Sequence, residues 1–575
     1  MLKLSAFLRP YRGPVALVLA LALAQSLASL YLPRLMADIV DHGIVPDDRR
    51  QIMIYGGLML LMALVSTAAA VASSFFSAKV ASGFGRDVRN RIFDRVAHVS
   101  VHQFDRFSTA SLITRTTNDT TQVQQVLIML MTMVITAPMM AIGGVMLSLS
   151  QDARLARVLL AVIPILSAVL FLIMRGAVPL FQQMQVQIDR LNLVLDEGLT
   201  GVRVIRAFDR GAHESRRFDE ANADVTATAI SVNRLVALLM PALFLTMNLT
   251  GVSILWLGAS RIDAGAMQVG AMMASLQYAI QILFAVFMVT AVFVMLPRAA
   301  ASAARINEVL EVRPDVSDPA SPERAAQATG LVEFRDVTFK FPGAEEPALS
   351  GVSFTARPGE TIAVIGGTGS GKSALAGLSP RFYDVDAGRV LVDGVDVRER
   401  RLEELRAGIG YVPQKTVLFS GTITSNIRFG NDGASDEEVR HAAAVAQASE
   451  FIDATPQGYD SAVSQGGTNL SGGQKQRLAI ARALARRARI YVFDDSFSAL
   501  DFATDARLRA ALRRETTGAT VFLISQRIGT VRDADRIIVL DDGRVTGAGT
   551  HAELMRDCAV YREIAASQAS LEEVA

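Results

Sequence analysis

The chain has 575 residues, of which 51% are hydrophobic and 20% are charged. Soluble proteins carry about 25% charged residues, so the composition argues against a chain that is exposed to water over its whole length. The formal net charge of +1 argues against a strongly basic nucleic-acid-binding protein. The single cysteine, Cys558, excludes an internal disulfide framework and a cysteine-based zinc site.

Six long segments in the first half of the chain contain no Asp, Glu, Lys or Arg. A helix needs about 20 apolar residues to cross ~30 Å of hydrocarbon, and five of the six segments reach that length. The fourth, Val158–Met174, is at the short limit and is also compatible with a buried core helix, although the apolar character resumes after Arg175. We predict six transmembrane helices, at residues 13–33, 52–78, 122–149, 155–175, 235–259 and 266–297.

Arginines are concentrated in two connections between these segments, 79–119 and 175–234, whereas the connection 36–51 is rich in aspartate. Positively charged connections stay on the cytoplasmic side, so we expect both of them and both termini in the cytoplasm. Only six of the 57 basic residues are lysines, an arginine bias typical of GC-rich bacterial coding sequences, so we expect the helices in a bacterial inner membrane. No small-residue cleavage motif follows the first apolar segment, which predicts a retained helix rather than a signal peptide. Apolar residues recur at helical spacing in Phe84–Val99 and Gln182–Glu197, so the transmembrane helices are expected to continue into the cytoplasm.

The uncharged segments contain no histidine either. Carriers driven by proton or sodium gradients usually need ionisable groups inside the membrane, so the energy for any transport is expected from another source. The polar residues of these segments serve either as helix-to-helix hydrogen bonds or as substrate contacts. They include Gln25, Ser26, Asn248, Gln277 and Gln281. Uncharged spans predict contact with membrane lipid and an apolar or amphipathic substrate.

A segment rich in Pro, Ser, Ala and charged residues, 313–330, is predicted to be a linker between a transmembrane domain, 1–312, and a soluble domain, 331–575. Four short apolar segments of the soluble domain are expected to be buried strands. They are Thr361–Ile365, Ile490–Phe493, Thr520–Ile524 and Ile537–Leu540. They alternate with predicted helices such as Glu437–Phe451 and Lys475–Ala485, which indicates an α/β fold with a largely parallel sheet.

A phosphate-binding motif follows the first of these strands. It consists of Gly366, Gly367, Thr368, Gly369, Ser370, Gly371, Lys372 and Ser373, with Ala374 next in the chain. In this G-x-x-x-x-G-K-[ST] pattern (Walker A), glycines let backbone N–H groups surround phosphate oxygens at a helix N-terminus. Lys372 is expected to neutralise the β- and γ-phosphates of ATP, and the Ser373 hydroxyl to bind Mg²⁺. Asp494, at the end of the second strand, is expected to bind the same Mg²⁺ (Walker B).

A third motif lies between the two Walker motifs, and a basic helix follows it. It consists of Leu470, Ser471, Gly472, Gly473 and Gln474. On these residues the chain resembles the ABC transporter family, of which Leu-Ser-Gly-Gly-Gln is the signature. The resemblance extends over the whole chain and is to a half-transporter of the multidrug- and lipid-exporter type. It implies an α-helical membrane domain of six transmembrane helices, followed by an α/β P-loop NTPase domain of the ABC type.

The resemblance implies further roles. Gln414 is at the Q-loop position, which in relatives contacts Mg²⁺ and the transmembrane domain, and Asp501 ends the D-loop, Ser498–Asp501. Phe341 is where relatives stack an aromatic ring on adenine, with plain core packing as the alternative. Segments 111–119 and 201–208 resemble the cytoplasmic tips that couple to nucleotide-binding domains. In this family each ATP lies between the Walker motifs of one subunit and the signature of the other.

Two residues depart from the pattern of relatives that hydrolyse ATP. Those relatives have glutamate directly after the Walker B aspartate, where this chain has Asp495, and a switch histidine where it has Gln526. The aspartate side chain is one methylene shorter, so its carboxylate is poorly placed to orient attacking water, and glutamine cannot share a proton as imidazole does. We therefore expect slow hydrolysis from the catalytic group Asp495, Gln526 and Gln414.

These features favour one subunit of a heterodimeric ABC transporter. A second half-transporter would supply an intact glutamate and histidine, and the signature of this chain would complete that partner's site. Three alternatives stay open: a slow homodimeric transporter, an exporter-like importer of a siderophore or lipid, and an ATP-binding membrane regulator. For the transporter, the prediction is export of a drug, lipid or lipopeptide.

Overall fold

The computed structural model describes residues 2–572, which divide into two compact units. The first unit runs up to Ala97 and resumes over Ser108–Val312, and the second takes His98–Phe107 and continues from Arg313. The first unit is helical, whereas the second combines helices with strands. The fold class expected from the sequence is confirmed.

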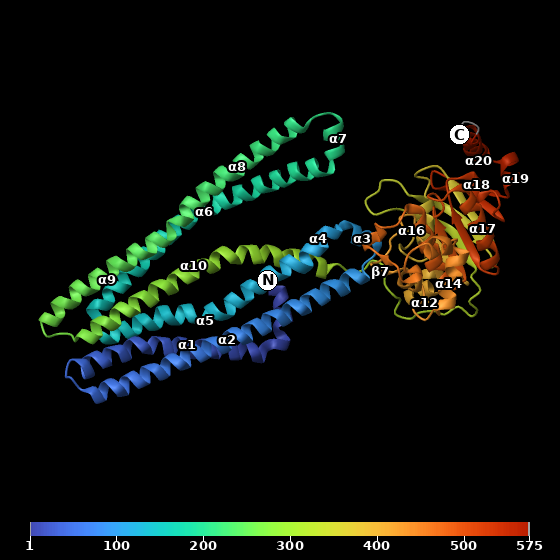
Figure 1. Cartoon of the computed structure of the whole chain (residues 1–575). Coiled ribbons are helices and arrows are strands. Elements are labelled where there is room, and N and C mark those ends of the chain that lie inside the picture. Colours follow the sequence, from blue (N-terminus) through green and yellow to red (C-terminus); the bar gives the residue numbers. More distant parts are fainter. Residues whose placement is uncertain (1, 573–575) are drawn as a thin grey trace. The chain divides into compact units, whose positions relative to one another are not determined.

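Six helices of the described residues are long and apolar enough to cross a membrane (Figure 1). The candidate spans are Lys3–Ile44, Arg49–His98, Thr109–Gln151, Ala153–Thr200, Gly211–Asp263 and Val269–Val289. The six predicted transmembrane helices are therefore confirmed. The fourth is one helix of 48 residues, and this length excludes the alternative of a short core helix over Val158–Met174.

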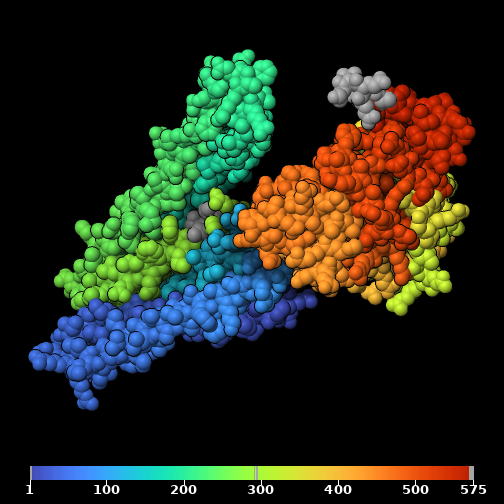
Figure 2. Space-filling model, turned by 45° about the vertical axis from the view of Figure 1, so that its right-hand side comes forward, coloured from blue at the N-terminus to red at the C-terminus, as the bar shows by residue number. Residues whose placement is uncertain are grey.

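The helices that begin in the first unit are α1 (Arg12–Ile39), α2 (Arg49–His98), α4 (Thr109–Thr114), α5 (Thr120–Gln151), α6 (Ala153–Thr200), α7 (Val202–Ala207), α8 (Gly211–Ala237), α9 (Leu239–Asp263) and α10 (Val269–Glu311), with a 3₁₀ helix at Leu2–Tyr11 and π-helical turns at Val40–Ile44 and Arg115–Asp119. Of these, α2, α6 and α10 extend well beyond the uncharged segments. The continuation of α2 and α6 past their apolar segments agrees with the helical spacing in the sequence. In Figure 2 the arm formed by α6 and α8 projects away from α2.

Inside this unit, α5 packs along α10, α1 packs on both, and α6 packs along α8 and α9. Tyr278 of α10 is fully buried and donates a hydrogen bond to the Leu30 carbonyl of α1, at 3.1 Å. Gln281 Nε2 donates to the Ser29 carbonyl, also of α1, at 3.4 Å. Asn248 instead donates to a carbonyl of its own helix. Gln281 therefore forms the expected hydrogen bond between two helices, whereas the side chain of Asn248 is bonded within its own helix.

The turn Arg115–Asp119 ties the start of α5 to the end of α10. The buried carboxylate of Asp119 forms an ion pair with Arg305 and accepts a hydrogen bond from Ser302 Oγ, at 2.9 Å. Arg115 Nη1 lies 2.9 Å from the Glu308 carboxylate. By contrast, Phe208, directly after α7, is 74% exposed, so its ring is available for a contact outside this unit.

Among residues 2–572, the strands of the second unit form three sheets. The six-stranded sheet has the order β12-β11-β3-β10-β9-β6, and every neighbouring pair in it is parallel except β11 and β12. Its strands are β3 (Thr361–Gly366), β6 (Ile409–Val412), β9 (Ile490–Asp494), β10 (Thr520–Ile524), β11 (Arg536–Asp541) and β12 (Arg544–Gly549). All four strands expected from the sequence lie in this sheet, so the largely parallel sheet is confirmed.

The other two sheets are antiparallel and were not expected from the sequence. Their strands are β1 (Val332–Phe339), β2 (Leu349–Ala356), β4 (Ala387–Val392) and β5 (Val395–Asp396) in one, and β7 (Gly421–Thr422) and β8 (Ala462–Val463) in the other. The helices of the unit are α3 (Val101–Arg106), α11 (Lys372–Leu378), α12 (Leu402–Ala407), α13 (Ile423–Arg428), α14 (Asp436–Val445), α15 (Ser449–Asp453), α16 (Gly472–Ala485), α17 (Phe502–Glu515), α18 (Ile528–Val531), α19 (His551–Asp557) and α20 (Ala559–Glu572).

One expected helix of the second unit is wrong as a single element. Glu437–Phe451 is divided between α14 and α15, because Gln447 has a φ of 56°, a left-handed conformation that interrupts a helix. The segment 313–330 forms no helix or strand. It nevertheless lies against this unit, since Asp318 accepts a hydrogen bond from the Leu402 N–H, at 2.8 Å.

Candidate nucleotide site

The phosphate-binding motif connects β3 to α11. Gly369 and Gly371 have φ values of 84° and 94°, in the left-handed region that glycine adopts readily. A Cβ on Gly371 would lie 2.3 Å from the Ala348 carbonyl oxygen, so a larger residue does not fit there. Lys372 Nζ donates to the Gly366 carbonyl, at 2.9 Å, which holds the cation inside the loop.

Three parallel strands bring the predicted site residues to one edge of the sheet. β10 lies between β3 and β9, and its last residue, Ile524, is opposite Val364 on one side and Asp494 on the other. The carboxyl ends of parallel strands meet at the same edge, where open α/β sheets bind ligands. The Walker A loop, Asp494 and Gln526 are therefore neighbours at this edge.

A hydroxyl and a carboxylate meet beside the loop. Ser373 Oγ donates to Asp494 Oδ1, at 3.4 Å. Burial raises the pKa of Asp494, and the hydrogen bond from Ser373 and the charge of Lys372 only partly offset it. Burial lowers the pKa of Lys372, against the opposite effect of Asp495 and Asp494. Hydroxyl and carboxylate oxygens are the ligands that Mg²⁺ prefers, so this group fits a phosphate chain accompanied by Mg²⁺.

Asp495 has a constrained backbone. Its φ is 45°, and its N–H donates to the Ile524 carbonyl, at 2.9 Å. The side chain is half-buried, and burial raises its pKa, while the charge of Arg527 and a hydrogen bond with Gln414 act in the opposite direction. Asp495 therefore lies beside Gln414, and the charge of Lys372 also acts on the Asp495 carboxylate.

Gln526 is exposed in the turn after β10. The next residue, Arg527, was not identified from the sequence. Its Nη2 donates to the Ser498 carbonyl, at 3.0 Å, so it joins this turn to the D-loop. The only signal for it in the sequence is its position beside Gln526.

Two other predicted residues lie apart from this group. The Phe341 ring is 39% exposed and packs edge-on against Phe339 and Tyr383, with ring centroids at 4.9 and 5.6 Å. This exposure fits a stacking surface better than plain core packing, and stacking on adenine stays a prediction. The Asp501 side chain caps α17 by accepting a hydrogen bond from the Thr504 N–H, at 2.9 Å, and a contact to nucleotide stays a prediction for it too.

The signature residues form the N-terminus of α16. Ser471 Oγ accepts from the Gln474 N–H, at 3.3 Å, and Gln474 Oε1 accepts from the Ser471 N–H, at 2.8 Å. Ser471 and Gly472 are exposed, and no hydrogen bond within residues 2–572 joins the signature to the Walker A loop. Free N–H groups at a helix N-terminus attract anions, so this end of α16 is suited to a phosphate that does not belong to this chain's own Walker motifs.

The residue that holds the D-loop against the signature helix was also missed. Gln476 Oε1 accepts a hydrogen bond from the Ala499 N–H, at 3.1 Å, and its Nε2 donates to Ser498 Oγ, at 3.4 Å. A buried glutamine in a basic helix gives no sequence signal for such a contact.

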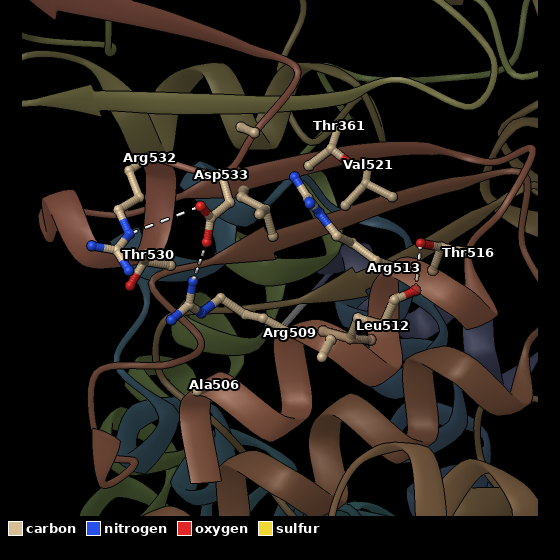
Figure 3. Close-up of a pocket in the computed structure, with 13 residues that line it drawn as sticks. Thr361, Ala506, Arg509, Leu512, Arg513, Thr516, Val521, Thr530, Arg532 and Asp533 are labelled. Carbon is tan, nitrogen blue, oxygen red and sulfur yellow. Dashed lines mark hydrogen bonds and ion pairs between the residues drawn. The ribbon is translucent and has the colours of Figure 1, made fainter. Parts of the chain in front are cut away.

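A cavity of about 260 Å³ lies at the opposite end of the same strands (Figure 3). Thr361, the first residue of β3, and Val521 of β10 line it, together with side chains of α17 and α18. Arg509 in this cavity is paired with Asp533, at 3.4 Å. Because the phosphate-binding loop follows the carboxyl end of β3, this cavity is not part of the nucleotide site.

Two family models match the chain. Residues 15–286 match the ABC transporter transmembrane region, and residues 349–498 match the ABC transporter domain. An ABC transporter ATP-binding protein of Mycobacterium tuberculosis is 44% identical over 98% of this chain and 97% of its own length. The ABC transporter ATP-binding protein YfiB of Bacillus subtilis is 41% identical over 99% of this chain and 98% of its own length.

Two further similarities concern an exporter and a flippase. An ATP-dependent lipid A-core flippase of Pseudomonas aeruginosa is 33% identical over 88% of this chain and 84% of its own length. The structure of a bacterial Atm1-family ABC exporter with ATP bound matches with a TM-score of 0.81 and 26% identity, over 98% of this chain and 99% of that one. The chain belongs to the ABC transporter family, as an exporter-type half-transporter whose transmembrane region is fused to an ATP-binding domain.

Proposed function

We propose that this chain is the slowly hydrolysing subunit of a heterodimeric ABC exporter in a bacterial inner membrane, with both termini in the cytoplasm. The observation that carries the proposal is Asp495 in the place that relatives give to the catalytic glutamate. Gln526 replaces the switch histidine, whereas the signature Ser471–Gln474 is intact. Such a chain would hold Mg-ATP at its own Walker motifs and complete a faster site on its partner.

The backbone of Asp495 supports slow hydrolysis. It is fixed on both sides, because its N–H donates to Ile524 and its carbonyl accepts from Ser498 Oγ, at 2.9 and 3.0 Å. The carboxylate therefore has little freedom to move toward the phosphates and replace the missing methylene. Burial raises the pKa of the Asp495 carboxyl, and the argument for a weak site rests on the short reach of this side chain.

An apolar pocket of about 640 Å³ between α6 and α10 supports an apolar or amphipathic substrate. Among the described residues, its lining contains no charged side chain and includes Ser167, Leu170, Phe171, Met174, Val178, Val286 and Val289. The similarity to lipid A-core flippases favours a lipid among such substrates, and the similarity to an exporter favours outward movement.

The experiment that tests the proposal compares the chain alone with the chain and a second half-transporter, both in liposomes. We expect the pair to hydrolyse ATP at least about tenfold faster, because a positioned base contributes 10²–10⁴-fold. We also expect it to move amphipathic dyes or lipid probes. Equal ATPase rates with and without the second half-transporter would support the homodimer. Inward movement of the dyes or lipid probes would support the importer. ATP binding without any flux would support the regulator, and movement of hydrophilic charged solutes alone would contradict the expected substrate class.

Asp494→Asn is expected to leave the nucleotide-free protein at least as stable as the wild type at pH 8, while abolishing stabilisation by Mg-ATP. Because burial raises the folded-state pKa of Asp494, the stability that the protonated group contributes is lost as the pH rises through that pKa. Asparagine removes this buried charge but is a poor Mg²⁺ ligand.

Thermal unfolding of the purified full-length chain measures both effects. With ATP at ~100 times its Kd, the wild type should gain about 2.7 kcal/mol, or about 5–10 °C in Tm. Asp432→Asn, an exposed aspartate of the same unit, is the matched control and should keep this gain. A full gain in Asp494→Asn would rule out Asp494 as a ligand of Mg²⁺.

A further inference from the structure

The turn that carries Gln526 is held by a side chain from the far end of the chain. Gln568 of α20 donates from Nε2 to the Gln526 carbonyl, at 2.6 Å, and its Oε1 accepts from the Ile528 N–H, at 2.8 Å. One half-buried amide therefore bonds the backbone on both sides of Arg527. We call this pair of hydrogen bonds the Gln568 clamp.

The helix that presents the clamp is itself anchored in the core. Tyr561 of α20 is fully buried in the main cluster of the unit, and Ile564 packs against the same cluster. The Tyr561 hydroxyl is hydrogen-bonded to His551 Nδ1, at 2.8 Å. Residues 561, 564 and 568 lie at i, i+3 and i+7, which is one face of a helix. The packing of the first two thus fixes where Gln568 points.

The clamped turn is also connected to Asp495. Arg527 Nη2 donates to the Ser498 carbonyl, at 3.0 Å, and Ser498 Oγ donates to the Asp495 carbonyl, at 3.0 Å. A continuous path of hydrogen bonds and covalent backbone therefore leads from α20 through the turn to the residue after Walker B. Of the side chains in this path, Gln568 is the one supplied by α20.

We propose that Gln568 is a positioning residue, which fixes the turn after β10 so that the Gln526 side chain faces the γ-phosphate of ATP bound by this chain. The inference rests on the proposed role of Gln526 in that site. An amide suits the clamp because it offers a donor to one backbone group and an acceptor to the other. Glutamate offers only the acceptor, and alanine offers neither.

Amide hydrogen exchange of the full-length chain tests the clamp without nucleotide. In Gln568→Ala the Ile528 N–H loses its acceptor, and we expect its exchange to accelerate about three- to tenfold, the size of one net hydrogen bond. Gln568→Glu keeps the acceptor and should preserve this protection. Glu563→Ala, an exposed position of the same helix, is the control and should leave Ile528 unchanged. Unchanged exchange in Gln568→Ala would overturn the clamp.

The preference for ATP over ADP tests whether the clamp positions Gln526. ADP lacks the γ-phosphate, so Gln568→Ala should weaken ATP binding about three- to tenfold and leave ADP binding unchanged, whereas general destabilisation would weaken both. Gln526→Ala should produce the same loss, and adding Gln568→Ala to it should have no further effect. Additive losses, or an unchanged preference in Gln568→Ala alone, would overturn the positioning role. If Gln526→Ala has no effect, the proposed role of Gln526 fails, and with it the positioning role, while the exchange result still decides whether the clamp exists.

Discussion

Ser471→Arg is expected to lower the steady-state ATPase activity of the assembled transporter by about 10²-fold or more, at least as much as the loss of a positioned catalytic group, because the arginine obstructs the partner's ATP. Asp495→Ala should change it only a few-fold. Ser471 is exposed at the N-terminus of α16, so the arginine side chain extends outward, where the partner's ATP is expected. Asp495, by contrast, belongs to a site that is expected to contribute little turnover.

A matched variant separates obstruction from damage to the helix. Ser471→Ala removes the N-cap hydrogen bond, which costs about 1 kcal/mol, but adds no bulk. It should keep most of the activity that Ser471→Arg loses. All three variants are compared by steady-state ATP hydrolysis after purification with the partner subunit. Severe and similar losses in Ser471→Arg and Asp495→Ala would mean that Asp495 is the working base, and the asymmetric division of labour would then be wrong.

The elements that the sequence predicts well are those defined by a long or repeated pattern. An uncharged apolar segment of about 20 residues is compatible with few structures other than a transmembrane helix. All six such segments form helices of the first unit. The buried strands β3, β9, β10 and β11 are short apolar runs that each follow or precede a helix, and parallel strands buried on both faces have this composition. Walker A and Asp494 then meet at one edge because β10 pairs with both of their strands.

The sequence did not predict the elements that depend on distant partners. The sheet of β1, β2, β4 and β5 is held by pairing between residues 332–339 and 387–392, and its mixed apolar and polar strands resemble loops when considered alone. The break at Gln447 was missed because its helical neighbours have good helix propensity, which tertiary packing overrides. Gln568 was missed for a similar reason, since a single glutamine in an amphipathic helix has no pattern that connects it to a turn 40 residues earlier.

Asp495→Glu combined with Gln526→His is expected to accelerate ATP hydrolysis at this chain's own site by about tenfold. The two changes restore the base and the imidazole that relatives use, and positioned groups of this kind contribute 10²–10⁴-fold. A smaller gain is expected for two reasons. Glutamate tolerates the φ of 45° at this position less well than aspartate, and the partner's signature, which faces this site, is expected to be altered.

The measurement needs a background in which the partner's site is silent. Ser471→Arg provides it, because this substitution blocks only the site that the signature of this chain completes. Single-turnover hydrolysis is then compared among Ser471→Arg alone, each single restoration and the double restoration. The Gln568 clamp bonds the backbone rather than the side chain of residue 526, so histidine there should be held in the same place as glutamine. A double restoration no faster than the background would show that neither residue limits this site, and that the slow step lies with the partner's signature or with closure of the two subunits around ATP.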